Sequence, residues 1–218
     1  MIQTIPEIRS EVFPETVPLF TTSGAILLPH TTQSVNIYEE PYLHMIDEAL
    51  GNGRYVGVIQ PLIGTDEHAP LYHVGTLSKI ISFAETGDGR YLLNLQGMCR
   101  FELLDSTLTA KNYRVGTIDA SGYQDDLQLH HDLSFDREKL IKVLAGYFKG
   151  QGITADWGVI HNAASEELIS SLAIICPLEP NEKQALLEAA DFATRVELLI
   201  TLLEMASLSM EDSETARH

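Results

Sequence analysis

The chain has 218 residues, of which 44% are hydrophobic, and its 14 basic and 31 acidic side chains give a formal net charge of −17. This hydrophobic share is ordinary for a globular protein and excludes a disordered chain. The acidic balance disfavours nucleic acid and anionic lipid as partners, because binding to either depends on basic side chains that neutralise phosphates.

Nothing in the sequence indicates a membrane or secretory segment. No apolar run approaches the roughly 20 residues needed to span a bilayer. Residues 1–9 include Pro6 and Glu7 and lack the apolar core of a signal peptide. Cys99 and Cys176 lie far apart in apolar surroundings, which is typical of buried free thiols in a reducing compartment. We therefore expect a cytoplasmic protein that does not bind membranes.

The sequence predicts mainly strands in the first half of the chain. Apolar runs bounded by turn-forming residues predict strands at 25–28, 34–38 and 55–60, and a last strand at 113–118. The clearest element is a hairpin with strands at 79–85 and 91–104. Its turn contains Asp88-Gly89, and this pair readily adopts the positive φ angles of a tight hairpin.

The second hairpin strand alternates between two faces. Apolar residues that include Leu93, Leu95 and Phe101 share one face, whereas Arg100 lies on the other. Gly97, in the middle, would let the strand bend as a closing barrel requires. One helix interrupts the strands at 41–50, where Pro41 suits a first helical position and an apolar stripe follows.

Residues 123–133 are polar and acidic without a clear period, and we interpret them as a solvated connector. The second half is helical. An apolar stripe over residues 140–148 predicts a helix that stops near Gly150, and further helices are predicted to begin near residues 165, 180 and 191. Short loops between them predict a small antiparallel bundle. We therefore expect two domains, residues 1–122 and residues 123–218, with the bundle packed on the barrel.

Several ordered segments together resemble the N-terminal substrate-recognition domain of Lon proteases, in the form of a bacterial stand-alone member. The segments that carry the resemblance are 18–20, 24–29, 37–39, 72–77, 88–91, 97–101 and 182–188. One departure is Glu39-Glu40-Pro41-Tyr42, which stands where the family commonly has Glu-Pro-Arg-Tyr. Any contact made by that arginine in relatives is therefore missing here.

The resemblance implies an α+β fold, a PUA-like β-pseudo-barrel followed by a C-terminal helical bundle. It also implies a non-catalytic module that binds unfolded or partly folded polypeptide, as an adaptor or a protein quality-control accessory that works with a protease or chaperone. RNA binding is the alternative, since PUA folds elsewhere bind RNA, but the charge of −17 opposes it. The oligomeric state and the recognised motif stay open.

Residue patterns that would indicate catalysis or a cofactor are missing from the sequence. No Gly-Lys-Ser/Thr stands in a phosphate loop, no Gly-x-Ser-x-Gly is present, and two cysteines cannot form a four-cysteine zinc site. His130-His131-Asp132 is the tightest group of potential metal ligands, and we interpret it as part of the solvated connector. The carboxylate pairs Glu39-Glu40 and Asp125-Asp126 are interpreted as helix-start charges and solvated connector. We expect neither enzymatic activity nor a bound cofactor or metal.

A peptide groove is our hypothesis for the binding site. Tyr38 and Tyr55 could supply apolar and aromatic surface, and Arg100 the one fixed cation for an acidic group of the peptide. The alternative for Arg100 is a salt bridge with a carboxylate across the sheet.

Overall fold

The computed structural model describes residues 13–62, 64, 68–128 and 134–215, with side-chain surroundings up to residue 208. The chain folds into two compact units, one of residues 1–23 and 27–129 and the other of residues 24–26 and 130–218. The segment after the last strand, residues 121–127, packs on the strand of residues 91–108 and so belongs to the first unit.

The first unit holds the strands. Its elements are β1 (Thr16–Thr21), β2 (Thr32–Ile37), α1 (Glu40–Gly51), β3 (Tyr55–Ile59), β4 (Val74–Glu85), β5 (Tyr91–Leu108), β6 (Arg114–Asp119) and the 3-10 helix η1 (Ser121–Leu127).

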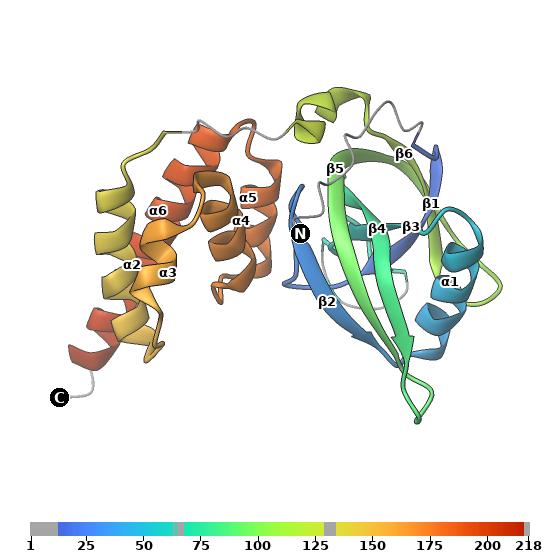
Figure 1. The fold of residues 1–218 in the computed structure, drawn as a ribbon, viewed down its shortest axis with the longest axis horizontal. Helices are drawn as coiled ribbons and strands as arrows, with labels where there is room; N and C mark the ends of the chain where they lie inside the picture. The colour runs from blue at the N-terminus through green and yellow to red at the C-terminus, as the bar shows by residue number, and fades with distance from the viewer. Residues whose placement is uncertain (1–12, 63, 65–67, 129–133, 216–218) are drawn as a thin grey trace, which may run out of the picture. The chain divides into compact units, whose positions relative to one another are not determined.

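Five of the strands close into a barrel (Figure 1). β1 pairs in parallel with β3 and antiparallel with β6, β3 pairs with β4, and β4 pairs with β5. The pairing of β5 with β6 closes the ring. In the described part of the chain β2 stands outside this ring and pairs with β5 alone. The expected closed β-structure and the α+β class are confirmed.

Closure depends on the length and irregularity of β5. One edge of β5 pairs with β4, while the other edge pairs first with β2 and then, from Glu102 onward, with β6. Register shifts leave Met98 and Leu104 without a partner of their own, which marks β-bulges at both residues. Bulges increase the local bend and twist of a strand, and a small barrel needs both.

The barrel interior is organised around Phe101. Its core side chains are Val17, Leu19, Ile59, Leu77, Cys99, Phe101 and Ile118. Glycines make room for the ring, since a Cβ added to Gly75 would lie 2.5 Å from the Phe101 side chain. A Cβ added to Gly57 would lie 2.8 Å from the Leu19 side chain. These glycines are therefore required for close packing of the barrel interior.

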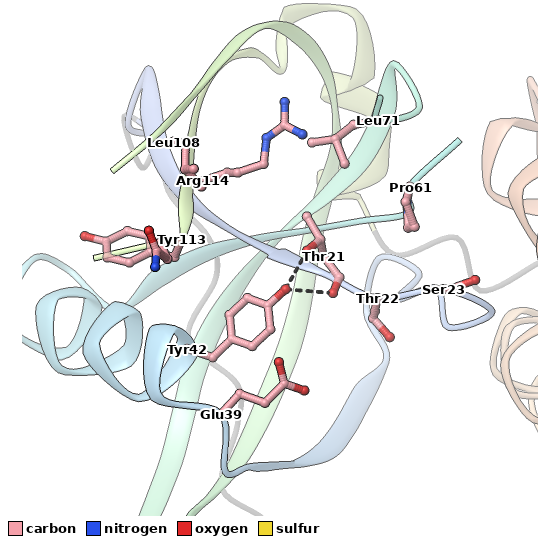
Figure 2. Close-up of a pocket in the computed structure, with 11 residues that line it drawn as sticks. Thr21, Thr22, Ser23, Glu39, Tyr42, Pro61, Leu71, Leu108, Tyr113 and Arg114 are labelled. Carbon is pink, nitrogen blue, oxygen red and sulfur yellow. Dashed lines mark hydrogen bonds between the residues drawn. The ribbon is translucent and has the colours of Figure 1, made fainter. Parts of the chain in front are cut away.

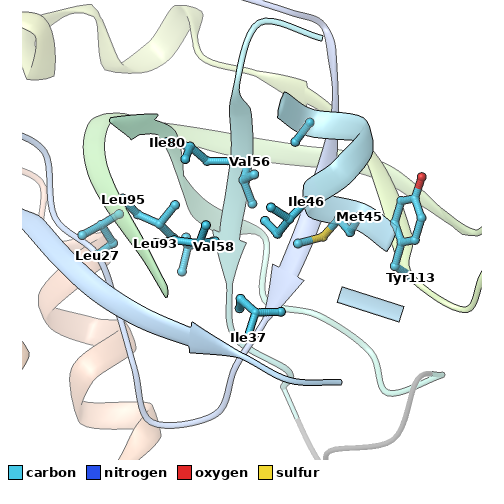
Figure 3. Packing of buried hydrophobic residues seen from close by; sticks show 11 residues of the cluster. Leu27, Ile37, Met45, Ile46, Val56, Val58, Ile80, Leu93, Leu95 and Tyr113 are labelled. Atoms are coloured by element: carbon cyan, nitrogen blue, oxygen red, sulfur yellow. The ribbon is translucent and has the colours of Figure 1, made fainter. Parts of the chain in front are cut away.

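A second core joins α1 to the strands (Figure 3). As predicted, Pro41 stands in the first turn of α1, and the apolar stripe buries Met45, Ile46 and Ala49. They pack with the buried strand side chains Ile37, Val56, Val58, Ile80, Leu93 and Leu95. Leu93 and Leu95 lie on the core side of β5, as the alternation predicts.

The prediction of a strand at 25–28 is wrong, because this segment is coil. Leu27 and Leu28 are nevertheless buried, and the Leu27 carbonyl accepts a hydrogen bond from Thr76 Oγ1 at 2.5 Å. Their apolar side chains enter the core without strand pairing, so hydrophobicity alone gave a misleading signal. β1, which the sequence pattern did not indicate, is a strand of the sheet and pairs with β3 and β6.

The predicted hairpin is confirmed, although both strands extend further than expected. β4 begins at Val74 instead of residue 79, and β5 continues to Leu108 instead of residue 104. In the turn, Gly89 has a φ of +80°, and the amide of Thr86 donates to the Arg90 carbonyl at 2.8 Å. Figure 1 shows this hairpin extending beyond the barrel.

The second unit is helical, as expected for residues after about 134. Its helices are α2 (Arg137–Gln151), α3 (Trp157–Asn162), α4 (Ser165–Ile175), α5 (Pro180–Glu188) and α6 (Phe192–Thr215). α5 begins with a capping box of Glu179 and Glu182, and Asp191 caps α6 by accepting from the Thr194 amide at 2.8 Å. Among the described residues no helix combines the length and apolarity needed to cross a membrane.

Gly97→Ala should destabilise the barrel, because a Cβ at this position would lie 2.2 Å from the carbonyl oxygen of Leu28. That oxygen belongs to the backbone and cannot turn aside as a side chain would. We expect a loss of about 1–3 kcal/mol in the free energy of unfolding, measured with urea and circular dichroism. Gly87→Ala is the matched control, since its Cβ would meet open space. Equal stability of the two variants would contradict the close approach of Leu28.

Candidate functional site

Arg100 forms a buried ion pair with Asp126. Its Nε donates to Asp126 Oδ2 and its Nη2 to Asp126 Oδ1, both at 2.8 Å. The Arg100 amide also donates to Asp126 Oδ2 at 2.9 Å. The two side chains are 8% and 10% exposed, and the guanidinium lies 4.8 Å from the Tyr123 ring centre.

Arg100 thus has the carboxylate partner that the sequence offered as one alternative. The partner is a carboxylate, but it comes from η1 and not from a residue across the sheet. The interpretation of Asp126 as part of a solvated connector is therefore wrong. The seven residues of η1 lack apolar periodicity. They are held in place because Asp126 and Tyr123 both contact Arg100 of β5.

The other two predicted groove residues lie in different surroundings. Tyr38 directly follows β2 and is 64% exposed. Tyr55 is half-buried, its ring lies edge-on to Phe13, and Lys79 Nζ lies 5.1 Å from its centre. Tyr55 lines a pocket with a volume of about 270 Å³, to whose walls neither Tyr38 nor Arg100 contributes. A peptide groove on the three residues stays a prediction, and a peptide acid there would have to compete with Asp126 for Arg100.

A polar pocket lies between the start of α1, the end of β1 and the β5–β6 turn (Figure 2). Its volume is about 240 Å³, and Glu39, Tyr42 and Arg114 lie in its wall. The Tyr42 hydroxyl donates to the Thr21 carbonyl at 3.0 Å. Arg114 donates to the Ala69 carbonyl at 2.7 Å and to Ser106 Oγ at 2.5 Å. These groups hold the wall together, and Tyr42 serves as an anchor of α1 on β1.

Four large apolar side chains are exposed at the far end of the hairpin and of β2. This hairpin patch consists of Tyr38 (64% exposed), Ile81 (46%), Phe83 (47%) and Leu92 (49%). The strand register divides them between the two faces of the hairpin. Phe83 pairs with Leu93 and shares its face, whereas Leu92 pairs with Asn36 and Ala84 on the other face. The Phe83 and Tyr91 rings meet edge-on at 5.7 Å. Exposed apolar side chains at one end of a hairpin offer contacts to another protein.

The sequence analysis missed three members of the hairpin patch, although two signals were present. Leu92 and Leu93 are consecutive in one strand and must point to opposite faces, so one of them leaves the core. Ile81 stands at a bulge, where the register shifts between Ile80 and Ser82. A bulge breaks the alternation from which the facing of a side chain is predicted.

The two thiols have a structural role in this fold. Cys99 and Cys176 are free and buried. Burial raises the pKa of Cys99 to about 12 and that of Cys176 to about 11. A protonated thiol is a poor nucleophile and metal ligand. No group of three or more potential metal-ligating side chains occurs among the described residues, and His130-His131-Asp132 lies outside them.

Comparison with known proteins gives one consistent result. The model of the ATP-dependent protease La (LON) substrate-binding domain matches residues 16–205. Lon protease 2 of Myxococcus xanthus is 22% identical over 204 residues, which cover 90% of this chain and 24% of that protein. The Lon protease of Desulfosudis oleivorans is 34% identical over 104 residues, which cover 44% of this chain and 13% of that protein. The chain thus spans about a quarter or less of the length of these relatives.

Solved structures agree on the fold. A Lon N-terminal domain protein from Xanthomonas campestris has a TM-score of 0.61 at 22% identity, covering 85% of this chain and 97% of that one. The N-terminal domain of the Mycobacterium avium complex Lon protease has a TM-score of 0.58 at 16% identity, covering 86% and 97%.

Arg100→Met should cost about 3–5 kcal/mol in the free energy of unfolding, because it leaves the carboxylate of Asp126 buried without its cation. Urea unfolding measures the loss. The matched control is Arg90→Met, which removes the ion pair with Asp88, whose two side chains are more than half exposed. The control should cost less than about 1 kcal/mol. Similar small costs for both variants would show that the Arg100 pair is not needed for folding.

Stability should fall as the pH rises above the ordinary pKa of a thiol, about 8.5. Burial keeps Cys99 protonated in the folded chain up to a pKa of about 12. The folded state then binds more protons than the unfolded state, so its stability decreases with pH across this window. Urea unfolding at pH 8, 9 and 10 should show a smaller decrease for Cys99→Ala than for the unchanged chain. Equal slopes would contradict the raised pKa.

Proposed function

This chain belongs to the family of ATP-dependent protease La (Lon) substrate-binding domains, and on that premise we propose that it binds unfolded or partly folded polypeptide without altering it chemically. The observation that carries the proposal is the family match over residues 16–205. In the cell the module would act as an adaptor or quality-control accessory that presents polypeptide to a protease or chaperone.

The hairpin patch supports this function. Unfolded polypeptides differ from folded proteins in exposing apolar side chains, and Tyr38, Ile81, Phe83 and Leu92 offer apolar surface that such side chains can cover. The patch is built on paired strands, so it needs little ordering before a partner binds. A few partly exposed anchors give weak binding, and we expect dissociation constants on the order of micromolar or poorer.

The charge of the chain supports a preference among polypeptides. At a net charge of −17 the chain repels acidic segments and attracts segments rich in lysine and arginine. The same charge opposes RNA as a partner. The buried thiols of Cys99 and Cys176 suit the reducing cytoplasm, where we propose that the module works.

Reduced and carbamidomethylated α-lactalbumin, whose cysteines carry a neutral cap and which stays unfolded in buffer, should bind to the chain, whereas folded α-lactalbumin should not. Fluorescence anisotropy of the labelled polypeptide measures the affinity, and gel electrophoresis should show that the polypeptide remains intact. Leu92→Ser should weaken binding about three- to tenfold, a loss of roughly 0.7–1.4 kcal/mol.

Leu104→Ser is the matched control, since Leu104 lies on the same strand, is 60% exposed and stands outside the hairpin patch. It should leave the affinity unchanged. If the unchanged chain bound folded and unfolded α-lactalbumin equally, or bound neither, polypeptide recognition would be excluded as its function.

A further inference from the structure

The backbone of β2 exposes alternate residues on its outer edge. In an antiparallel pair, residues that exchange hydrogen bonds alternate with residues whose N–H and C=O groups point away. The Gly97 amide donates to the Thr31 carbonyl at 2.9 Å, which makes 31 and 97 a hydrogen-bonded pair. By alternation Gln33, Val35 and Ile37 bond to β5, and the backbone groups of Thr32, Ser34 and Asn36 point outward.

A second hydrogen bond leads to the same assignment of inward- and outward-pointing residues on β2. The Ile80 amide donates to the Arg54 carbonyl at 2.8 Å, away from β5. Lys79, its neighbour on β4, must then bond to its register partner Gln96. The backbone groups of Gln96 therefore face β4, so that Thr32, its register partner on β2, is left to the outer edge.

This outer edge, defined by the backbone groups of Thr32, Ser34 and Asn36, is open in the described part of the chain. All three residues are exposed, and their backbone groups form no hydrogen bond with another described backbone. Natural sheets protect edges with lysine, proline, charged side chains or bulges. The β2 sequence Thr-Gln-Ser-Val-Asn-Ile contains no charged residue and no proline, and its pairing with β5 runs without a register shift.

We propose that the outer edge of β2 receives an extended segment of unfolded polypeptide as an additional antiparallel or parallel strand, an inference that rests on the proposed polypeptide-binding function. Three residues offer three donors and three acceptors at a spacing of two residues, which any extended backbone except proline can match. Backbone pairing tolerates many sequences, and a module that recognises unfolded chains needs this tolerance.

The residues that follow β2 indicate which kind of polypeptide segment the edge would bind. Tyr38 of the hairpin patch directly follows β2, so a segment paired with β2 passes an exposed aromatic ring at one end. The exposed Glu39 and Glu40 come next in the chain, which favours a segment with lysine or arginine and few acidic residues. A second copy of this chain would bring another charge of −17 to the same edge, so self-pairing is disfavoured.

Ser34→Pro tests the edge directly. The Ser34 amide takes no part in the pairing with β5, so proline here should keep the sheet while it removes the central outward donor and obstructs an incoming strand. Ser34→Ala is the matched control, because it too loses the bond from Ser34 Oγ to Asn94 Oδ1 but keeps the amide. Carbamidomethylated α-lactalbumin should bind about tenfold more weakly to Ser34→Pro and within about twofold of the unchanged affinity to Ser34→Ala.

Amide hydrogen exchange of the unchanged chain, followed by NMR, tests the edge without a substitution. In the free chain the amides of Gln33, Val35 and Ile37 should be protected, and those of Thr32, Ser34 and Asn36 should exchange fast. Saturation with carbamidomethylated α-lactalbumin should slow exchange of these three edge amides at least several-fold. Protection of the edge amides already in the free chain, or none after saturation, would overturn the proposal.

Two further outcomes separate this inference from the function on which it rests. If the unchanged chain binds unfolded α-lactalbumin and folded Ser34→Pro binds it equally well, the edge proposal fails while the function stands. If the unchanged chain does not bind it at all, the function itself fails. Sedimentation that showed a dimer of the unchanged chain and a monomer of Ser34→Pro would identify the edge as a self-association surface and overturn the proposal.

Discussion

β5 pairs with β4 along one edge and divides its other edge between β2 and β6, and the rest of the first unit depends on this division. The part of β5 that meets β6 closes the barrel around Phe101. The part that meets β2 lies outside the ring and forms a three-stranded sheet of β2, β5 and β4, whose β2 edge pairs with no other strand among the described residues. One strand of 18 residues thus builds both a sealed interior and an open surface.

Bulges and glycines make this double use of β5 possible. A closed ring of five strands has a narrow interior, and Phe101 fits because Gly57 and Gly75 carry no side chain. The bulges at Met98 and Leu104 change the direction of β5 where it passes from one set of partners to the next. Bulges also turn side chains out of the alternation, so the same device that bends the sheet places Ile81 and Leu104 in solvent.

Two of the arginines form contacts within the fold. Arg100 is satisfied within the barrel unit by Asp126, and Arg114 is occupied by a carbonyl and a hydroxyl. The net charge of −17 acts on partners as a general field, whereas the apolar hairpin patch and the β2 backbone offer local contacts. Under the proposed function, such a surface would select a polypeptide by its extended, apolar and acid-poor character instead of by one sequence motif.

Local patterns in the sequence determined much of this protein. The Asp-Gly turn predicted the hairpin, the alternation of Leu93 and Leu95 predicted the core face of β5, and the stripe on α1 predicted its buried side. Each depends on residues a few positions apart, whose spacing is the period of a strand or a helix. The tertiary structure alone decided the role of the coil at Leu27 and Leu28, the partner of Arg100 and the free edge of β2. These features depend on residues distant in the chain, and no local period records which of them meet when the barrel closes.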